Sequence, residues 1–406
     1  MKNDKTIMFE NSQTTVFQVI LMIHTYCVRF NVSDEGRHAL FNMAKIWADP
    51  KVENINYTKY KLSKRLDPTE NIYQYIFYCS KCNCLLGKFV KKDLILNTQS
   101  ICDKCQQNYK ITTNAMNYFL SIDVKFQMKT LLENVTIRKM LMENITIIKN
   151  RLKKKRINTI NDVYDGELYK NLYNNQQENT ILLTFNFNSD GAPISKSSKS
   201  GIWPIQIIIN ELPPRVRFRY ILLAAMWMTR SEPSPQFMNL YMKIFIDQLR
   251  NLMENGITIK LSNNKEIIFI LKPLCAAVDS VARPVMQNRL QFNGHYGCSW
   301  CYHFGKYEDG AMRYPFEDED SLLRNHNTFI QNMIETEETN KFVMGVKGYA
   351  EITNLDNFDC IWGFPFDYMH GLLLGTVCTL WTKIWTVKGT NKFNLSKKDI
   401  KKVEER

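Results

Sequence analysis

Four cysteines in the first third of the chain have the spacing of a metal site. Cys79 and Cys82 form one Cys-x-x-Cys pair, and Cys102 and Cys105 form a second. Each pair bends the chain so that two thiolates face one ion, and the residues between the pairs can form a hairpin that closes a tetrahedral zinc site with four cysteine ligands. We therefore predict a structural zinc here. Cys84 is either a spectator or a replacement for Cys82.

Two aspartates follow apolar runs that have the composition of strands. Asp190 follows the alternating run LTFNFNS, and Gly191 permits a sharp turn directly after it. Asp279 follows the apolar run LCAAV. If the two strands are neighbours, the carboxylates converge, and two Mg²⁺ ions about 3.5–4 Å apart would offset their repulsion and suit phosphodiester chemistry. The alternative is that each aspartate only begins a turn or caps a helix.

A third cysteine pair and a group of arginines are further candidates for chemistry. Cys298 and Cys301 lie in the stretch NGHYGCSWCYH. They are either metal ligands or a structural cysteine pair without a metal. Arg215, Arg217 and Arg219 alternate after ELPP, which predicts a strand with all three side chains on one face. That face either contacts DNA phosphates or is simply solvated.

The elements that position these residues follow from apolar periodicity. It divides the chain into a helical N-terminal region at 1–70, a zinc ribbon at 71–112, a helical and basic linker at 113–160, an α/β region with a mixed sheet at 161–292, and a loop-rich region with a C-terminal helix at 293–406. We expect two helices within 14–48, helix over 115–147 and the last helix near 368–387. The basic cluster at 149–156 suits a linker, a nuclear-import signal or a phosphate-contacting patch.

The bulk composition limits the class of protein. The 406 residues suffice for two or three domains, and 45% hydrophobic residues indicate a globular chain. A net charge of +13 favours a polyanionic partner, with nucleic acid first and general solubility as the alternative. The N-terminus lacks the layout of a secretory signal, and the longest apolar runs are too short to span a bilayer. We therefore expect a soluble intracellular protein with no membrane partner, whose eleven cysteines stay reduced.

Three separated blocks resemble one known family. In order, the blocks are FNFNSDGAPISKSSKSGIWPIQIIINELPP, AAVDSVARPVMQNRLQFNGHYGCSWC and GFPFDYMHGLLLG. Together they resemble cut-and-paste DDE transposases of the CACTA-like group, within the CACTA–Mirage–Chapaev superfamily. The resemblance covers roughly residues 70–400. It implies an RNase H-like catalytic core at 161–292, with Asp190 and Asp279 as the first two metal-binding acids.

The resemblance also implies a second zinc, which clips an insertion to the catalytic core. Its ligands would be Cys298, Cys301 and His370, the histidine of the block DYMHG. As the fourth ligand we prefer Asp367, one helical turn before His370, over His303. A water or a downstream residue is also open.

By the same resemblance the protein cleaves DNA and joins it to a target by nucleotidyl transfer with two Mg²⁺ or Mn²⁺ ions. Its partners would be transposon ends, target DNA and further copies of itself, in the nucleus. A DDE site needs a third acid, and none is evident before the chain stops at KKVEER, with Glu404 as the fallback. We therefore expect a C-terminally truncated transposase of weak or no activity. The alternatives are a transposon-derived zinc-dependent DNA-binding protein without catalysis, and a zinc-ribbon protein whose partner is another protein.

Overall fold

The chain forms two compact units, Met1–Thr69 and Glu70–Arg406. The computed structural model describes residues 6–48, 72–95, 98–115, 117–154, 159–174, 180–194, 201–230, 233–261, 263–386 and 393–405. The basic cluster predicted at 149–156 lies partly outside these ranges. Within them, no helix is both long and apolar enough to cross a membrane.

The first unit is a helical hairpin that packs against a short ribbon. The ribbon pairs β1 (Ile7–Phe9) with β2 (Thr14–Thr15), and helices α1 (Val16–Arg29) and α2 (Asp34–Trp47) follow. The predicted pair of helices within 14–48 is confirmed. Their apolar faces close on a small core made of Met8, Val16, Val19, Ile20, Phe41 and Ala44.

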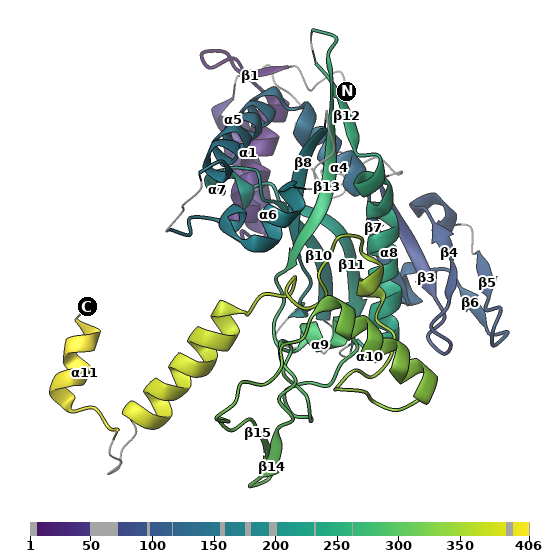
Figure 1. The fold of residues 1–406 in the computed structure, drawn as a ribbon. Coiled ribbons are helices and arrows are strands. Elements are labelled where there is room, and N and C mark those ends of the chain that lie inside the picture. Colours follow the sequence, from purple (N-terminus) through teal and green to yellow (C-terminus); the bar gives the residue numbers. More distant parts are fainter. Residues whose placement is uncertain are drawn as a thin grey trace. The chain divides into compact units, whose positions relative to one another are not determined.

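The second unit is α/β, with a curled mixed sheet of nine strands (Figure 1). The strands are β3 (Tyr73–Tyr78), β4 (Leu85–Phe89), β7 (Tyr118–Ile122), β8 (Thr180–Asn188), β9 (Ala192–Pro193), β10 (Gly201–Ile209), β11 (Leu222–Thr229), β12 (Ile257–Lys260) and β13 (Glu266–Ala276). They lie in the order β12-β13-β8-β10-β11-β7-β3-β4, and β9 pairs with β10. β8 and β13 run parallel, and the other neighbours are antiparallel. The predicted α/β class with a mixed sheet is therefore confirmed.

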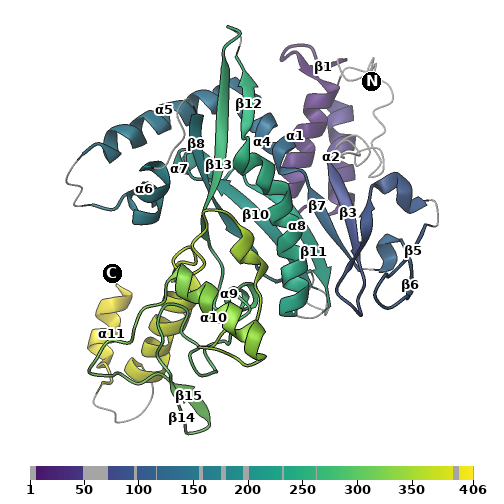
Figure 2. The ribbon, with the colours of Figure 1, turned by 45° about the vertical axis from the view of Figure 1, so that its right-hand side comes forward.

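Helices cover both faces of this sheet. Phe187 of β8 packs against Phe245 of α8 (Pro235–Glu254), with ring centroids 5.2 Å apart. Leu182 of the same strand lines a small cavity with Tyr169 of α6 (Glu167–Asn174). Alternate strand residues point to opposite faces, so α8 and α6 lie on opposite sides of β8. Figure 2 shows α8 running along its face of the sheet.

The remaining elements connect the strands or follow them. They are η2 (Lys91–Ile95), β5 (Gln99–Ile101), β6 (Asn108–Lys110), η3 (Thr113–Ala115), α4 (Val124–Glu133), α5 (Val135–Leu152), η4 (Val163–Asp165), α7 (Pro214–Arg217), α9 (Ala282–Met286), β14 (Lys306–Glu308), β15 (Ala311–Arg313), α10 (His326–Thr339), η5 (Glu351–Asn354), η6 (Tyr368–Val377), η7 (Leu380–Trp385) and α11 (Lys397–Glu404). The helix predicted near 368–387 is observed as the helical segments η6 and η7.

The predicted helix over 115–147 is wrong at its start. β7 occupies the beginning of this range, between β11 and β3, and the helices α4 and α5 follow it. The sequence YFLSI can form either structure locally, and two neighbouring strands decide for the strand because they satisfy its backbone hydrogen bonds.

Candidate metal and catalytic site

The parallel pairing of β8 with β13 brings the two candidate aspartates together. Phe187 lies opposite Ala276 in the ladder, and the Ala277 N–H donates to the Phe187 carbonyl at 2.8 Å. The Asn188 side chain also donates to the Ala277 carbonyl. Asp190 lies three residues after Phe187, and Asp279 lies three residues after Ala276. Both segments therefore place a carboxylate beyond the same end of the two paired strands. The condition for their convergence, that the two strands are neighbours, is therefore met.

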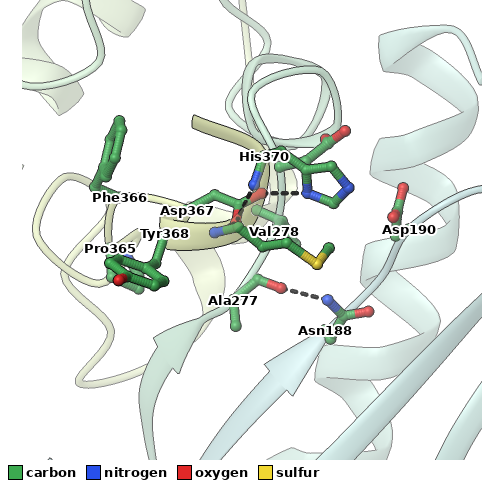
Figure 3. Close-up of a pocket in the computed structure, with 11 residues that line it drawn as sticks. Asn188, Asp190, Ala277, Val278, Pro365, Phe366, Asp367, Tyr368 and His370 are labelled. Atoms are coloured by element: carbon green, nitrogen blue, oxygen red, sulfur yellow. Dashed lines mark hydrogen bonds and ion pairs between the residues drawn. The ribbon is translucent and has the colours of Figure 1, made fainter. Parts of the chain in front are cut away.

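Both aspartates line one open pocket of about 310 Å³ (Figure 3). Its other walls come from residues 365–370, which carry Asp367 and His370 into the same space. Burial, and next the negative charge of Asp279, raise the pKa of Asp190 above its usual range. The described residues that line the pocket include no lysine or arginine. Three carboxylates and one imidazole therefore share a cavity that can receive a hard cation.

Asp279 is held in place by the helix that follows it. Its Oδ1 accepts hydrogen bonds from the Val281 N–H at 3.0 Å and from the Ala282 N–H at 2.6 Å, where α9 begins. The predicted helix cap is therefore present, and it uses one of the two carboxylate oxygens. The two roles considered for Asp279, cap and metal ligand, are compatible because a metal can bind through the other oxygen.

Asp367 and His370 form a close pair at the start of η6. The Asp367 Oδ1 accepts from the backbone N–H groups of Met369 at 2.9 Å and His370 at 3.1 Å, and its Oδ2 lies 2.5 Å from the His370 Nδ1. The hydrogen bond to Asp367 raises the pKa of His370 above its usual value. Burial alone would raise the pKa of Asp367, but hydrogen bonds from His370 hold it below its usual value.

The expected second zinc set does not assemble. Within the described ranges, one group of three or more potential ligands has all its donor atoms within 4.8 Å of one another. It includes neither Cys298 and Cys301 nor the acids and the histidine of the pocket. His370 and Asp367 bond to each other instead, in the pocket with Asp190 and Asp279. The structure does not bring these two side chains to the cysteine pair, so the assignment of His370 and Asp367 to that pair stays a prediction.

His303, the alternative ligand for this pair, is also committed elsewhere. Its Nε2 lies 2.8 Å from the Pro315 carbonyl, and its Nδ1 accepts from the Gly305 N–H at 3.0 Å. Cys298 and Cys301 remain partly exposed thiols in one turn, and the Trp300 N–H lies 3.5 Å from the Cys298 Sγ.

Comparison with known proteins assigns no family. No model of a known protein family matches this chain. A search of curated proteins likewise finds no significant match. The chemistry of the site is therefore inferred from its own residues.

The first four cysteines do assemble. The thiols of Cys79, Cys82, Cys102 and Cys105 all lie within 4.8 Å of one another. Four thiolates are the donor set that structural zinc prefers, so this cluster could bind a metal such as zinc. Cys84 lies at its edge, with its Sγ 3.3 Å from the Cys102 Sγ.

The two cysteine pairs sit in two equivalent turns. Cys79 follows β3, and its N–H donates to the Cys84 carbonyl just before β4, at 2.8 Å. Cys102 follows β5, and its N–H donates to the Gln107 carbonyl just before β6, at 2.9 Å. The expected single hairpin between the pairs is wrong, because each pair closes a hairpin of its own and the cluster joins the two.

The arginines after ELPP do not share a strand face. Pro214 starts the short helix α7, and its fixed φ favours a first helical turn over a strand. Arg217 is buried, and its guanidinium lies 2.8 Å from the Asp162 Oδ2. Arg215 and Arg219 are exposed. The predicted strand is wrong, and Arg217 forms an ion pair with Asp162.

No pattern in the sequence predicts that Asp367 lies in the carboxylate pocket. The only local signal was its position one helical turn before His370. Glu404, the fallback for a third acid, lies at the end of α11, and its side chain falls outside the described part of the chain.

Proposed function

We propose that this chain is a metal-dependent DNA nucleotidyl transferase of the DDE type, similar to the CACTA-like transposases that its sequence resembles. The observation that carries the proposal is the convergence of Asp190 and Asp279 in one pocket, at the ends of two parallel neighbouring strands. Two carboxylates that line one pocket offer the oxygen ligands that divalent cations prefer, and the positive charge of the buried Arg283 acts on Asp279 from outside the pocket lining.

The order of the strands supports an RNase H-like core. β8, β10 and β11 form an antiparallel meander, α8 follows, and β13 returns to lie parallel to β8. The resemblance implies a first acid after the first strand of this core and a second acid after the fourth. Asp190 follows β8, and Asp279 follows β13, with β12 added at the edge of the sheet.

Mg²⁺ or Mn²⁺ ions held by Asp190 and Asp279 would supply Lewis-acid activation of a water or a 3′-hydroxyl and stabilise charge on the scissile phosphate. The chain's own contribution is orientation. The α9 cap holds the Asp279 carboxylate by one oxygen, and the ladder between β8 and β13 holds the spacing of the two aspartates.

Zinc at Cys79, Cys82, Cys102 and Cys105 is proposed as structural. A site closed by four thiolates has no open position for substrate, so its contribution is to fix the two hairpins as a zinc ribbon. DNA is the proposed polyanion for a chain of net charge +13, and the exposed Arg215 and Arg219 remain candidates for phosphate contacts. Assembly on paired DNA ends and a nuclear location follow from the resemblance.

The test is nicking of supercoiled DNA by the full chain with Mg²⁺ or Mn²⁺. Asp190→Ala and Asp279→Ala should each lower the rate by about 10²-fold or more, because each removes a charge that the ions require. Asp356→Ala, at an exposed aspartate that does not line the pocket, is the matched control and should nick at the wild-type rate. Nicking that survives both pocket substitutions would mean that the acids are wrongly assigned.

The second candidate function is DNA binding without catalysis. It is favoured by the assembled cysteine cluster, and by the fact that Asp367, the third carboxylate of the pocket, is already engaged by His370 and by the backbone of η6. In that case the wild-type chain binds DNA in a strongly salt-dependent way, and neither metal ion supports nicking.

A further inference from the structure

We propose that His370, oriented by Asp367, is a third protein ligand of the divalent ion held by Asp190 and Asp279. This inference rests on the proposed function and deepens it. It also reassigns His370, which the resemblance places with the Cys298–Cys301 pair.

The first step is the hydrogen bonding of Asp367. Both of its carboxylate oxygens are engaged, Oδ1 by the backbone N–H groups at the start of η6 and Oδ2 by the His370 Nδ1 at 2.5 Å. Asp367 therefore has little capacity left for a metal of its own. Its position fixes the imidazole, with Nδ1 as the donor and Nε2 as the nitrogen that keeps a lone pair.

The second step is the direction of the ring. Figure 3 shows the His370 ring between Asp367 and Asp190, with Asp367 bonded on one side and Asp190 beyond the other. The same pocket wall contains Asp190, Asp279 and His370. Their donor atoms do not all lie within 4.8 Å of one another, so an ion bound by all three would draw the side chains together. Metal-binding histidines commonly donate one ring N–H to a carboxylate while the other nitrogen binds the ion, and this pair has that arrangement.

The third step is that the Cys298–Cys301 turn is held without His370. The buried Arg289 donates to the Cys298 carbonyl at 2.6 Å, and the buried Arg324 donates to the Cys301 carbonyl at 2.9 Å. Two guanidinium groups thus fix the carbonyls of both cysteines. The turn also contacts the segment just before His370, since the Trp300 Nε1–H donates to the Phe364 carbonyl at 3.2 Å and the Trp300 ring lies 5.9 Å from the Phe366 ring. These contacts come from Trp300 and not from a cysteine thiol.

A nitrogen ligand in an oxygen site has a chemical consequence. Imidazole suits transition-metal ions, whereas carboxylates and water suit Mg²⁺. The pocket should therefore bind Mn²⁺ in preference to Mg²⁺, and replacing His370 by a carboxylate should reduce that preference.

The experiment titrates Mn²⁺ into the full chain and measures free Mn²⁺ by electron paramagnetic resonance. His370→Ala and Asp367→Asn should each weaken binding by about 10–100-fold, because the first removes a ligand and the second its orienting carboxylate. His370→Asp should restore binding and lower the ratio of Mn²⁺ to Mg²⁺ affinity. His295→Ala is the matched control, since His295 is an exposed histidine that stacks on Phe304 and does not line the pocket. His370→Gln replaces His370→Ala if the latter loses its circular-dichroism signal.

Zinc content, measured by elemental analysis on the same samples, decides the alternative. Zinc held by cysteines should be unchanged in His370→Ala. The pocket would itself bind zinc, so the readout must separate the two sites. A loss of zinc in His370→Ala that is matched in Cys298→Ser and absent in Asp190→Ala and His295→Ala would place His370 with the cysteine pair and overturn the inference. Unchanged Mn²⁺ affinity in His370→Ala would also overturn it.

The outcome for the two aspartates separates this inference from the proposed function. If Asp190→Ala and Asp279→Ala both leave Mn²⁺ affinity unchanged, the proposed catalytic site is wrong, and the inference is wrong with it. If both weaken binding and His370→Ala does not, only the role of His370 is wrong.

Discussion

At the scale of single residues, the same side chain can satisfy two roles that look exclusive in sequence. Asp279 begins a helix and also lines the pocket, because its Oδ1 caps α9 while its carboxylate faces the cavity. Arg217 shows the opposite case. Its alternation with two other arginines predicts an exposed side chain. In the structure it is buried, because it pairs with the Asp162 carboxylate.

The ion pair of Arg217 with Asp162 should contribute to stability and not to DNA binding. The two side chains are 5% and 11% exposed, so Arg217→Met leaves Asp162 with little water to replace its partner. We expect the free energy of unfolding in urea to fall by about 3–5 kcal/mol. The matched variant Arg215→Ala, at an exposed position, should change it by no more than about 0.5 kcal/mol.

The salt dependence of DNA affinity gives the second readout for these arginines. If Arg217→Met stays as stable as the wild type and reduces the salt slope by about one, Arg217 contacts phosphate and the structural assignment is wrong.

At the scale of elements, the buried carboxylate of Glu211 links β8 to the end of β10. Glu211 follows β10, and its carboxylate accepts from the Thr184 N–H and from the Thr184 hydroxyl of β8, each at 2.8 Å. Burial raises the pKa of Glu211 to about 7, because hydrogen bonds only partly replace the lost water.

This shift makes stability depend on pH in a predictable direction. The native state binds the Glu211 proton more tightly than the unfolded state, whose usual pKa is 4.5, so the stabilising contribution is complete below that pH and is lost as pH rises through about 7. We expect the free energy of unfolding to fall by about 3 kcal/mol across this window through Glu211 alone. Denaturant titrations at about pH 5 and about pH 8 measure it.

Glu211→Gln is the control for that pH dependence. It keeps an acceptor for the Thr184 N–H and cannot titrate, so the difference between the two pH values should shrink by the Glu211 contribution. An unchanged difference would show that other groups dominate the window.

At the scale of the whole second unit, the cysteine cluster connects two hairpins that belong to different sheets. It ties the hairpin of β3 and β4, at the sheet edge, to the separate hairpin of β5 and β6. The two hairpins have short strands, so an ion between their turns would supply much of their mutual stability.

Loss of one cysteine ligand should therefore reduce zinc binding and lower the melting temperature. We expect Cys79→Ser to bind less zinc per chain than the wild type and to melt at a lower temperature, because it leaves three thiolates for a four-coordinate ion. Cys84→Ser is the matched control, since its thiol lies beside the cluster but outside the set of four. Loss of zinc in Cys84→Ser and not in Cys82→Ser would show that Cys84 replaces Cys82 as a ligand.

The sequence by itself determined the local features of this protein. Apolar runs predicted β8, β10, β13 and the amphipathic α8, because side-chain period and capping residues act within one element. The spacing of Cys79, Cys82, Cys102 and Cys105 predicted their cluster, since a Cys-x-x-Cys turn already faces two thiols to one ion.

Only the tertiary structure decided which distant segments meet. The segment of β7 is a strand because β11 and β3 lie on either side of it, and Arg217 is buried because Asp162 lies opposite it. The pocket depends most on such contacts. Asp190 and His370 are far apart in the sequence, and the residues next to them do not predict that they approach each other. The parallel pairing of β8 with β13 and the return of the chain at 365–370 create it, because packing between elements depends on the whole chain and not on local spacing.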